Sequence, residues 1–160
     1  MLEMKNVTYI YEDQTVALKD ISMDLSKGSC IGIIGSNGAG KSTLFLNFTG
    51  VLKPKQGQIF YDEKPMKYDK ASLRELRKQV SIVFQDPDKQ IFFSKVYDDV
   101  AFALRNLGVD EKEINRRVNI ALASVAAKDF ADKPVHFLSH GQKKRVAIAG
   151  VIAMDSEIIF

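Results

Sequence analysis

Cysteine is almost absent from this sequence, and long apolar runs are missing altogether. The single Cys30 excludes an intramolecular disulfide framework and agrees with a reducing compartment such as the cytoplasm. No window approaches the roughly 18 uninterrupted apolar residues of a membrane-spanning helix, and the charged N-terminus lacks the apolar stretch of a signal peptide. Any association with a membrane is therefore expected to be peripheral.

Charge of one sign is not concentrated in any part of the chain. The 160 residues include 23 Lys and Arg and 20 Asp and Glu, and the two signs alternate without a long basic block. The sequence therefore gives no reason to expect a nucleic-acid partner. With 46% hydrophobic and 27% charged residues, no repeat and no low-complexity tract, the composition is typical of one ordinary globular domain.

The first half of the chain predicts strands, a glycine-rich loop and a helix. Apolar and polar residues alternate over 2–11 and 17–25, which predicts a pair of half-buried strands. The run 30–34 is continuously apolar, so a central strand covered on both faces is expected there, with Cys30 buried. A helix is expected over 41–49, with Gly50 as its end.

The second half predicts further strands and several capped helices. A capping box beginning at Ser72 indicates a short helix, and Ser94 is expected to cap a helix that runs to Leu107 and ends at Gly108. The helix that begins at Asp110 should bury one apolar stripe, namely Ile114, Val118, Ala121, Leu122 and Val125. The other expected elements are strands over 58–61, 80–84 and 157–160 and a helix over 139–154.

Residues 35–42, Gly-Ser-Asn-Gly-Ala-Gly-Lys-Ser, have the spacing of a phosphate-binding loop between a strand and a helix. Small residues allow the backbone to wrap around a polyphosphate, whose charge then faces N–H groups and the helix N-terminus. Lys41 is expected to bridge the β- and γ-phosphates, and the Ser42 hydroxyl to bind Mg²⁺. A glycine-rich turn that matches by chance is disfavoured by the flanking elements. The predicted nucleotide-binding residues of this loop are Gly35, Ser36, Asn37, Gly38, Ala39, Gly40, Lys41, Ser42 and Thr43.

A second motif, Leu-Ser-His-Gly-Gln over 138–142, precedes an apolar-periodic helix. Ser139 and Gln142 have the spacing of a capping box, so another helix start able to face an anion is expected. The basic residues 143–145 lie in the first turn, where the helix dipole disfavours each cation by a few tenths to ~1 kcal/mol. An anionic partner is therefore expected, although a solvated capped helix would explain this motif equally well if it stood alone.

Taken together and in this order, the two motifs resemble the ATP-binding cassette (ABC) ATPases, and the resemblance extends along the whole chain. It implies an α/β fold, a phosphate-loop NTPase core with an N-terminal antiparallel β subdomain and a helical subdomain. The corresponding boundaries are 1–87, 88–156 and 157–160. In this family two cassettes face head to tail, so Ser139, Gly141 and Gln142 of one would contact ATP held by the loop of the other.

Two further positions take their expected roles from the resemblance. Tyr11 is similar to the aromatic residue on which adenine stacks, and Gln85 to the glutamine that touches Mg²⁺ and the attacking water. Lys41 and Gln85 are thus the expected catalytic residues. Tyr9 competes with Tyr11 for the stacking role, and both tyrosines have a plain alternative as strand aromatics that fill the core.

Three segments resemble one branch of the family, the ATPases of energy-coupling-factor importers for cobalt, nickel and vitamins. They are 84–92, 94–100 and 141–150. The resemblance implies ATP-driven import, transmembrane importer subunits as partners, a second cassette that is either a copy or a paralogue, and a peripheral position on the cytoplasmic face of the membrane. An ABC ATPase that acts on ribosomes or DNA, and a non-catalytic nucleotide-binding module, stay open as alternatives.

The sequence departs from the family pattern at two places. His140 stands where glycine is commonest, and a metal pair formed with His136 is disfavoured because no Cys or carboxylate cluster joins them. In the family, a strand like 157–160 leads into an Asp that supports Mg²⁺ and a Glu that polarises water, and neither is among these residues. We therefore expect the chain by itself to bind ATP poorly or moderately and to hydrolyse it hardly at all. With the C-terminal strands of the family's sheet missing, it is also expected to expose apolar faces and strand edges.

Overall fold

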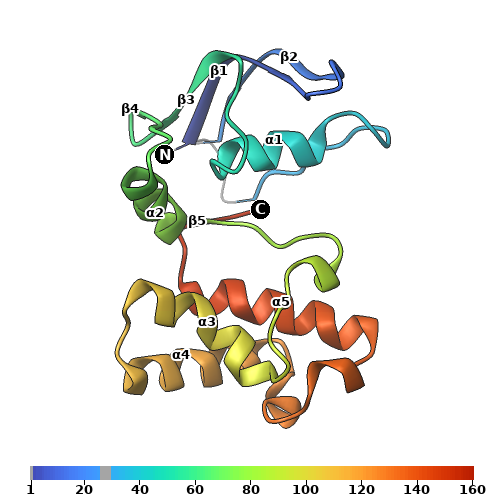
Figure 1. The fold of residues 1–160 in the computed structure, drawn as a ribbon, viewed down its shortest axis with the longest axis vertical. Coiled ribbons are helices and arrows are strands. Elements are labelled where there is room, and N and C mark those ends of the chain that lie inside the picture. Colours follow the sequence, from blue (N-terminus) through green and yellow to red (C-terminus); the bar gives the residue numbers. More distant parts are fainter. Residues whose placement is uncertain (1, 26–29) are drawn as a thin grey trace. The chain divides into compact units, whose positions relative to one another are not determined.

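The computed structural model describes residues 2–25 and 30–160. They form two compact units, Met1–Arg77 and Lys78–Phe160 (Figure 1). Each unit has its own buried apolar side chains and is described by itself below. No helix in the described ranges combines the length and the apolar character that crossing a bilayer requires.

The first unit is built on an antiparallel sheet with the strand order β2-β1-β3-β4 (Figure 1). Its strands are β1 (Leu2–Ile10), β2 (Val16–Asp24), β3 (Gln56–Tyr61) and β4 (Lys64–Pro65). In β1 the buried residues are Leu2, Met4 and then Val7. Val7 lies three residues after Met4, although side chains on one face of a strand normally recur every two residues. The register shifts between Met4 and Val7, and such a bulge moves the later side chains to the other face. The predicted pair of half-buried strands is confirmed.

Two helices accompany this sheet. Helix α1 (Lys41–Phe48) buries Leu44 and Phe48, and the chain leaves it at Gly50 with a φ of 66°, as predicted. Helix α2 (Lys70–Gln79) begins earlier than the capping box predicted at Ser72. The Asp69 carboxylate accepts a hydrogen bond of 3.0 Å from the Ser72 N–H, so Asp69 caps this helix and the prediction for Ser72 was wrong.

The apolar run 30–34 forms no strand, which corrects the sequence prediction. Neither sheet of the described residues includes it, Cys30 is exposed, and Ile31 and Ile34 are 46% and 99% exposed. A central parallel strand needs hydrogen-bonded strands at both edges and helices over both faces, and no strand of the two sheets pairs with this segment. The expected exposure of apolar residues is therefore observed, whereas the expected burial of Cys30 is wrong.

The second unit is a packed group of three helices, α3 (Val96–Leu107), α4 (Glu111–Ser124) and α5 (His140–Met154) (Figure 1). Helices α3 and α4 both pack on α5. The stripe predicted for α4 is confirmed, with Val125 partly buried and the other four residues buried. The fully buried core side chains of this unit include Val96, Val100, Leu104, Ile114, Val118, Leu122 and Val146.

Short elements complete the second unit. Strand β5 (Val80–Ser81) pairs in parallel with β6 (Ile158–Ile159), so strands are confirmed within 80–84 and 157–160, in shortened form. Three single-turn 3₁₀ helices lie between the longer elements. They are η1 (Pro87–Lys89), η2 (Lys128–Phe130) and η3 (Val135–Phe137).

The starts of α3 and α4 show one wrong and one correct prediction. Helix α4 begins as expected, since the Asp110 carboxylate accepts a 2.9 Å hydrogen bond from the Lys112 N–H. Helix α3 has Lys95 as its N-cap without a side-chain bond, so Ser94 does not cap it. The Ser94 carbonyl instead accepts a 2.7 Å bond from the Val135 N–H, which ties this turn to η3.

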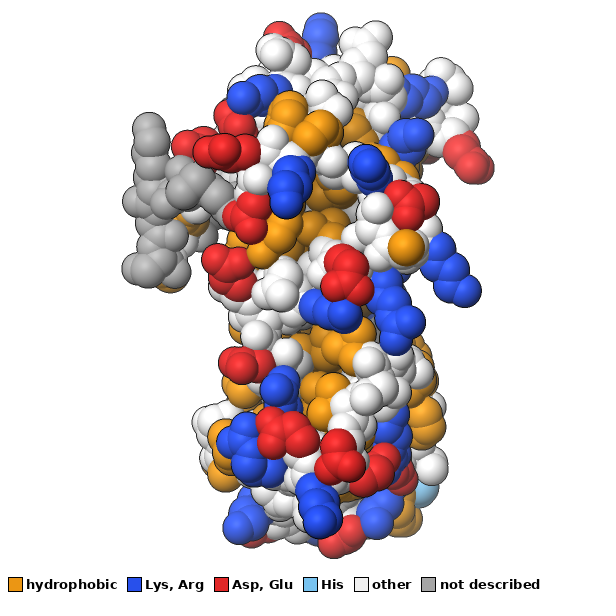
Figure 2. Space-filling model, turned by 90° about the vertical axis from the view of Figure 1, so that its left-hand side faces the viewer, with side chains coloured by type: hydrophobic (Ala, Val, Ile, Leu, Met, Phe, Trp, Pro, Cys, Tyr) orange, Lys and Arg blue, Asp and Glu red, His pale blue; other side chains and the backbone are white. Residues whose placement is uncertain are grey.

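Charged side chains of both signs are intermixed on the face shown in Figure 2. Ion pairs connect Arg105 with Asp98 and Glu111. The Glu113 carboxylate pairs with the guanidinium groups of Arg116 and Arg117, each at 2.7 Å. This surface resembles a mixed solvated face more than a basic nucleic-acid footprint.

The Glu113 cluster predicts an unusual acid titration. Hydrogen bonds from Arg116 and then Arg117 lower the pKa of Glu113 from 4.5 to about 2. Because the folded-state pKa is depressed, the stabilisation is complete above pH 4.5 and is lost as the pH falls towards 2. We expect NMR titration of the Glu113 carboxyl carbon to show a midpoint near pH 2. Arg116→Gln should raise this midpoint while the neighbouring Lys112→Gln should not, and an ordinary midpoint in the unmodified protein would contradict the geometry.

Candidate nucleotide-binding site

The loop that leads into α1 folds around its own lysine. The Lys41 ammonium donates hydrogen bonds of 2.7 Å to the carbonyl oxygens of Gly35 and Ser36. An ammonium group has three donors, so two shape the loop and one stays available. The loop therefore presents a fixed positive charge with one donor for an external acceptor.

The backbone of this loop requires glycine at its last position. Gly40 has a φ of 85°, and a Cβ at this position would lie 2.4 Å from the carbonyl oxygen of Ala17 on β2. Gly38 has nearly the same conformation, with a φ of 82°, but a Cβ there would meet no atom within 4 Å. The sheet thus fixes the point at which the loop turns into the helix.

The first turn of α1 is open to an anion. Its N-cap, Gly40, supplies no side-chain hydrogen bond, and the first turn contains no acidic residue. The first N–H groups of a helix have no intrahelical partner and carry partial positive charge. Ser42 is exposed, and its hydroxyl oxygen lies in the same turn. Oxygen atoms are the ligands that Mg²⁺ prefers. The loop and helix start therefore fit a polyphosphate with its metal ion.

Tyr11 is held at this helix by a side-chain hydrogen bond. Its hydroxyl lies 2.8 Å from the Thr43 hydroxyl, and the Tyr9 ring packs edge-on against it with centroids 5.0 Å apart. Tyr11 is 37% exposed whereas Thr43 is buried. The structure therefore brings Tyr11 to the phosphate loop with part of its ring accessible, and it commits the Thr43 side chain to Tyr11. The backbone N–H of Thr43 is therefore the group of this residue that is suited to binding a nucleotide.

The second motif forms the capped start of α5, as the sequence predicts. The Ser139 hydroxyl accepts a hydrogen bond of 3.3 Å from the Gln142 N–H, and the Gln142 side chain accepts one of 2.9 Å from the Ser139 N–H. In this arrangement the Ser139 hydroxyl is an acceptor, so its own hydrogen can still be donated. His140 and Gly141 are exposed, and a Cβ on Gly141 would meet nothing within 4 Å. This helix start can therefore be approached closely by an acceptor from another molecule.

Two of the basic residues after this motif, Lys143 and Arg145, have partners within the chain. The Lys143 ammonium lies 2.6 Å from the Asp88 carboxylate. The Arg145 guanidinium donates to the Ala126 carbonyl at 2.9 Å and lies over the Phe130 ring. An anionic partner is thus present for Lys143, and Asp88 supplies it.

Gln85 is exposed, and the residues around it are held by a glutamine that local sequence patterns do not identify. The Gln90 side chain accepts a 2.9 Å hydrogen bond from the Phe84 N–H and donates one of 2.9 Å to the Ala147 carbonyl of α5. These partners are 6 and 57 residues away in sequence. Only the three-dimensional structure shows that Gln90 joins them.

The predicted site residues fall into two groups, one in each unit. Tyr11 lies with the loop residues 35–43 in the first unit, and Gln85 lies with Ser139, Gly141 and Gln142 in the second. His136 packs against Phe137, with ring centroids 4.2 Å apart. Within the described ranges, no three His, Cys, Asp or Glu side chains are grouped so that they could hold a metal ion.

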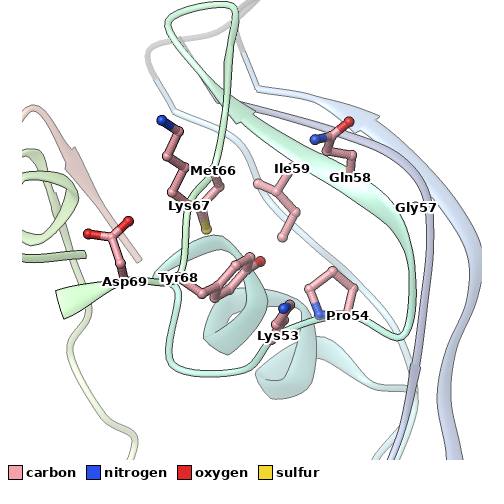
Figure 3. Close-up of a pocket in the computed structure, with 9 residues that line it drawn as sticks. All are labelled: Lys53, Pro54, Gly57, Gln58, Ile59, Met66, Lys67, Tyr68 and Asp69. Atoms are coloured by element: carbon pink, nitrogen blue, oxygen red, sulfur yellow. The ribbon is translucent and has the colours of Figure 1, made fainter. Parts of the chain in front are cut away.

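A cavity of about 390 Å³ lies beside β3 and β4 in the first unit (Figure 3). None of the predicted site residues lines it. The hydroxyl of Tyr68 is buried there without a protein hydrogen-bond partner, and burial raises the pKa of Tyr68 to about 12. The Lys53 ammonium lies 5.5 Å from the centre of this ring. The cavity is separate from the phosphate loop.

Gly40 and Gly38 provide a matched pair of substitutions. Gly38→Ala places a side chain in a left-handed conformation, which costs about 1–2 kcal/mol of folding free energy. Gly40→Ala should cost more, because the same conformation is combined with a collision against the Ala17 carbonyl. Urea unfolding of both variants measures the difference. Equal destabilisation would mean that the approach of β2 to Gly40 does not constrain the loop.

Comparisons with known proteins agree with this geometry. The sequence profile of the ABC transporter family matches residues 18–160. The chain is 50% identical over 159 residues to the energy-coupling factor transporter ATP-binding protein EcfA of Methanocaldococcus jannaschii, covering 99% of this chain and 57% of that protein. It therefore spans little more than half the length of this curated relative.

Solved structures give the same result. The structure of cbiO1 from Clostridium perfringens, part of the ABC transporter complex cbiONQ, matches with a TM-score of 0.85 and 47% identity, over 99% of this chain and 63% of that one. A dimeric ATP-binding cassette, MJ0796, bound to ADP and Pi matches with a TM-score of 0.89 and 28% identity, over 99% of this chain and 72% of that one. The expected ABC ATPase fold is thus confirmed, and this chain belongs to the ABC transporter family as an ATP-binding cassette protein.

Proposed function

We propose that this chain is the nucleotide-binding part of an ATPase subunit that drives an importer of the energy-coupling-factor type. The observation that carries the proposal is the phosphate loop, in which Lys41 keeps one free donor beside the uncapped start of α1. This combination of fixed charge and open amides suits the polyphosphate of ATP. The similarity to a protein named as an energy-coupling factor transporter ATP-binding protein supports the importer class.

The residues of the loop take complementary roles in this proposal. The amides of residues 35–43 surround the phosphates, the Lys41 ammonium binds the β- and γ-phosphates, and the Tyr11 ring stacks on adenine. The hydroxyl of Ser42 would hold Mg²⁺, which supplies positive charge to the phosphates when it is bound. The family resemblance implies the side chain of Gln85 as a further ligand. Gln85 also orients the attacking water. Lys41 and Gln85 are thus the proposed catalytic residues.

The start of α5 serves a second ATP molecule. In a head-to-tail dimer, Ser139, Gly141 and Gln142 contact the ATP held by the loop of the partner cassette. The free hydrogen of the Ser139 hydroxyl and the open space around Gly141 support this role, because a phosphate oxygen can approach both closely. The dimeric state of the MJ0796 cassette supports a dimer here, formed with a copy of this chain or with a paralogue.

Transport requires membrane partners, which we place among the integral subunits of an importer. The cassette then lies peripherally on the cytoplasmic face of the membrane, where ATP is available. A transition metal such as cobalt or nickel, or a vitamin, is the proposed cargo, in accord with the similarity to a component of the cbiONQ complex. The cargo is selected by a separate membrane protein, so no residue of this chain determines it.

A non-catalytic nucleotide-binding module is the second candidate. In the family, the strand that corresponds to 157–160 is followed by an Asp and a Glu, and these carboxylates are not among the 160 residues. We propose that the chain by itself binds ATP but hydrolyses it slowly. Binding depends on the loop, whereas hydrolysis also needs a group that orients water and supports the metal. The two candidates differ in one result. The importer ATPase predicts that the protein made from the whole reading frame containing these residues hydrolyses ATP, and the non-catalytic module predicts that it does not.

Substitution of Lys41 tests nucleotide binding. Lys41→Met removes the ammonium but keeps a side chain of similar length, so we expect the affinity for MgATP to fall at least tenfold, about 1.4 kcal/mol. Isothermal titration calorimetry with the 160-residue chain measures this change. Lys55→Met, in the same unit but outside the loop, is the control and should bind as the unmodified chain does. Equal binding by both variants would contradict the proposed site.

Expression of the whole reading frame tests hydrolysis. We expect the protein made from it to release phosphate from ATP at least one hundred times faster than the 160-residue chain, since an orienting or charge-stabilising group typically contributes that much. Phosphate release at saturating MgATP measures the ratio. Neighbouring reading frames that encode membrane proteins would support the importer. Equal, very slow rates for both proteins would favour the non-catalytic module.

A further inference from the structure

The segment that carries Gln85 is attached to α5 through one side-chain amide. Gln90 accepts from the N–H of Phe84, the residue directly before Gln85, at 2.9 Å, and donates to the Ala147 carbonyl at 2.9 Å. Both ends of the Gln90 amide are therefore used, one on each segment. Gln90 is partly buried, so the bridge is shielded to some extent from competing water.

A second contact joins the same two segments one turn away. Asp88 of η1 pairs with Lys143 of α5 at 2.6 Å. The Asp86 carboxylate accepts from the Asp88 N–H at 3.1 Å, which fixes the short turn that carries Asp88. Lys143 directly follows Gln142, the last residue of the predicted ATP-contacting motif. The ion pair thus lies at the very start of α5, and the Gln90 bridge lies further along the same helix.

We propose that Gln90, Asp88 and Lys143 form a latch that makes the segment around Gln85 and the start of α5 move as one body. This inference rests on the proposed function, in which Gln85 contacts the ATP of its own cassette and Ser139 to Gln142 contact the ATP of the partner. Within one cassette the latch then connects the two ATP sites of the dimer. Gln90 is a positioning residue, since it acts through Phe84 and Ala147 and does not itself touch ATP.

The Gln90 bridge and the Asp88–Lys143 ion pair are each weak, but together they can hold the segment around Gln85 on α5. A single neutral hydrogen bond or surface ion pair contributes little by itself. Two contacts at different heights along one helix, however, restrict both translation and rotation of the attached segment. Occupancy of one ATP site can then alter the other only as far as this connection is stiff.

Substitutions of Gln90 separate the two halves of the bridge. Gln90→Glu keeps an acceptor for the Phe84 N–H but loses the donor to Ala147, and Gln90→Leu loses both. Lys89→Gln, at the exposed last residue of η1 and directly before Gln90, is the matched control. All are made in the protein from the whole reading frame, and the steady-state ATPase rate is measured against ATP concentration.

We expect the unmodified protein and Lys89→Gln to hydrolyse ATP cooperatively, with a Hill coefficient clearly above 1. Gln90→Leu should lower the Hill coefficient towards 1. Its affinity for a non-hydrolysable ATP analogue at the phosphate loop should change less than about twofold. The Hill coefficient of Gln90→Glu should be close to that of Gln90→Leu. An unchanged Hill coefficient in both Gln90 variants would overturn the latch. A complete lack of ATP binding in the unmodified protein would instead overturn the proposed function.

Hydrogen exchange gives a second measurement that needs no cooperativity. The Phe84 amide is expected to exchange at least tenfold faster in Gln90→Leu than in the unmodified protein. At protein concentrations at which the cassette is monomeric, so that no partner ATP site reaches α5, the analogue should protect both 84–90 and the first turn of α5 in the unmodified protein, but only 84–90 in Gln90→Leu. If Gln90→Leu keeps both the slow Phe84 exchange and the joint protection, the latch is wrong.

A charge exchange tests the ion pair independently of Gln90. Asp88→Lys and Lys143→Asp each place like charges together and should reduce the Hill coefficient or, in its absence, the joint protection. The double variant restores opposite charges, and Asp at position 143 is also favoured by the helix dipole. Recovery in the double variant supports the latch. A double variant that behaves like the worse of the two single variants contradicts it.

Discussion

The chain enters α1 at a point where the backbone of β2 leaves no room for a side chain. The carbonyl oxygen of Ala17 lies within 2.4 Å of the place that a Cβ of residue 40 would occupy. This approach fixes where the loop ends and the helix begins, and hence where Lys41 can reach back to the carbonyls of Gly35 and Ser36. The nucleotide site of the first unit therefore depends on contact between the loop and the antiparallel sheet, and not on the loop sequence alone.

In the second unit, α5 has the corresponding central place. Its apolar residues pack against α3 and α4, its capping box presents the Leu-Ser-His-Gly-Gln motif, and its polar side receives the residues that follow Gln85. Helix α5 thus contributes to the apolar core, to a binding motif and to a side-chain bridge at the same time. The basic residue Lys143 lies in the first turn, where the helix dipole disfavours it. There it pairs with Asp88.

Local patterns predicted most of the fold, and contacts distant in sequence account for what they missed. The strand pair and the three long helices follow from alternation, apolar periodicity and caps, all of which operate within a few residues. The two motifs were equally visible as contiguous spacings. The cap at Ser72 was wrong because Asp69 offers a similar oxygen three residues earlier, and local chemistry alone does not rank the two.

The other misses have the same origin. The apolarity of 30–34 shows that this segment is suited to burial, but burial also needs neighbouring strands, which a local pattern does not contain. Gln90 could not be singled out, since one of its partners lies 57 residues away. Of the candidate site, the sequence therefore predicted the residues that carry local motifs, and it did not predict the contacts that hold them in place.

The two helices that begin at binding motifs differ in how complete they are. The start of α5 has a capping box formed by Ser139 and Gln142, whereas the start of α1 has no side-chain cap. In the proposed dimer, the free N–H groups in the first turn of α1 gain acceptors from the phosphates of ATP. At the start of α5, the Ser139 and Gln142 N–H groups already have acceptors within the chain, so this helix end depends less on a nucleotide. Loss of nucleotide should accordingly loosen one helix end and leave the other intact.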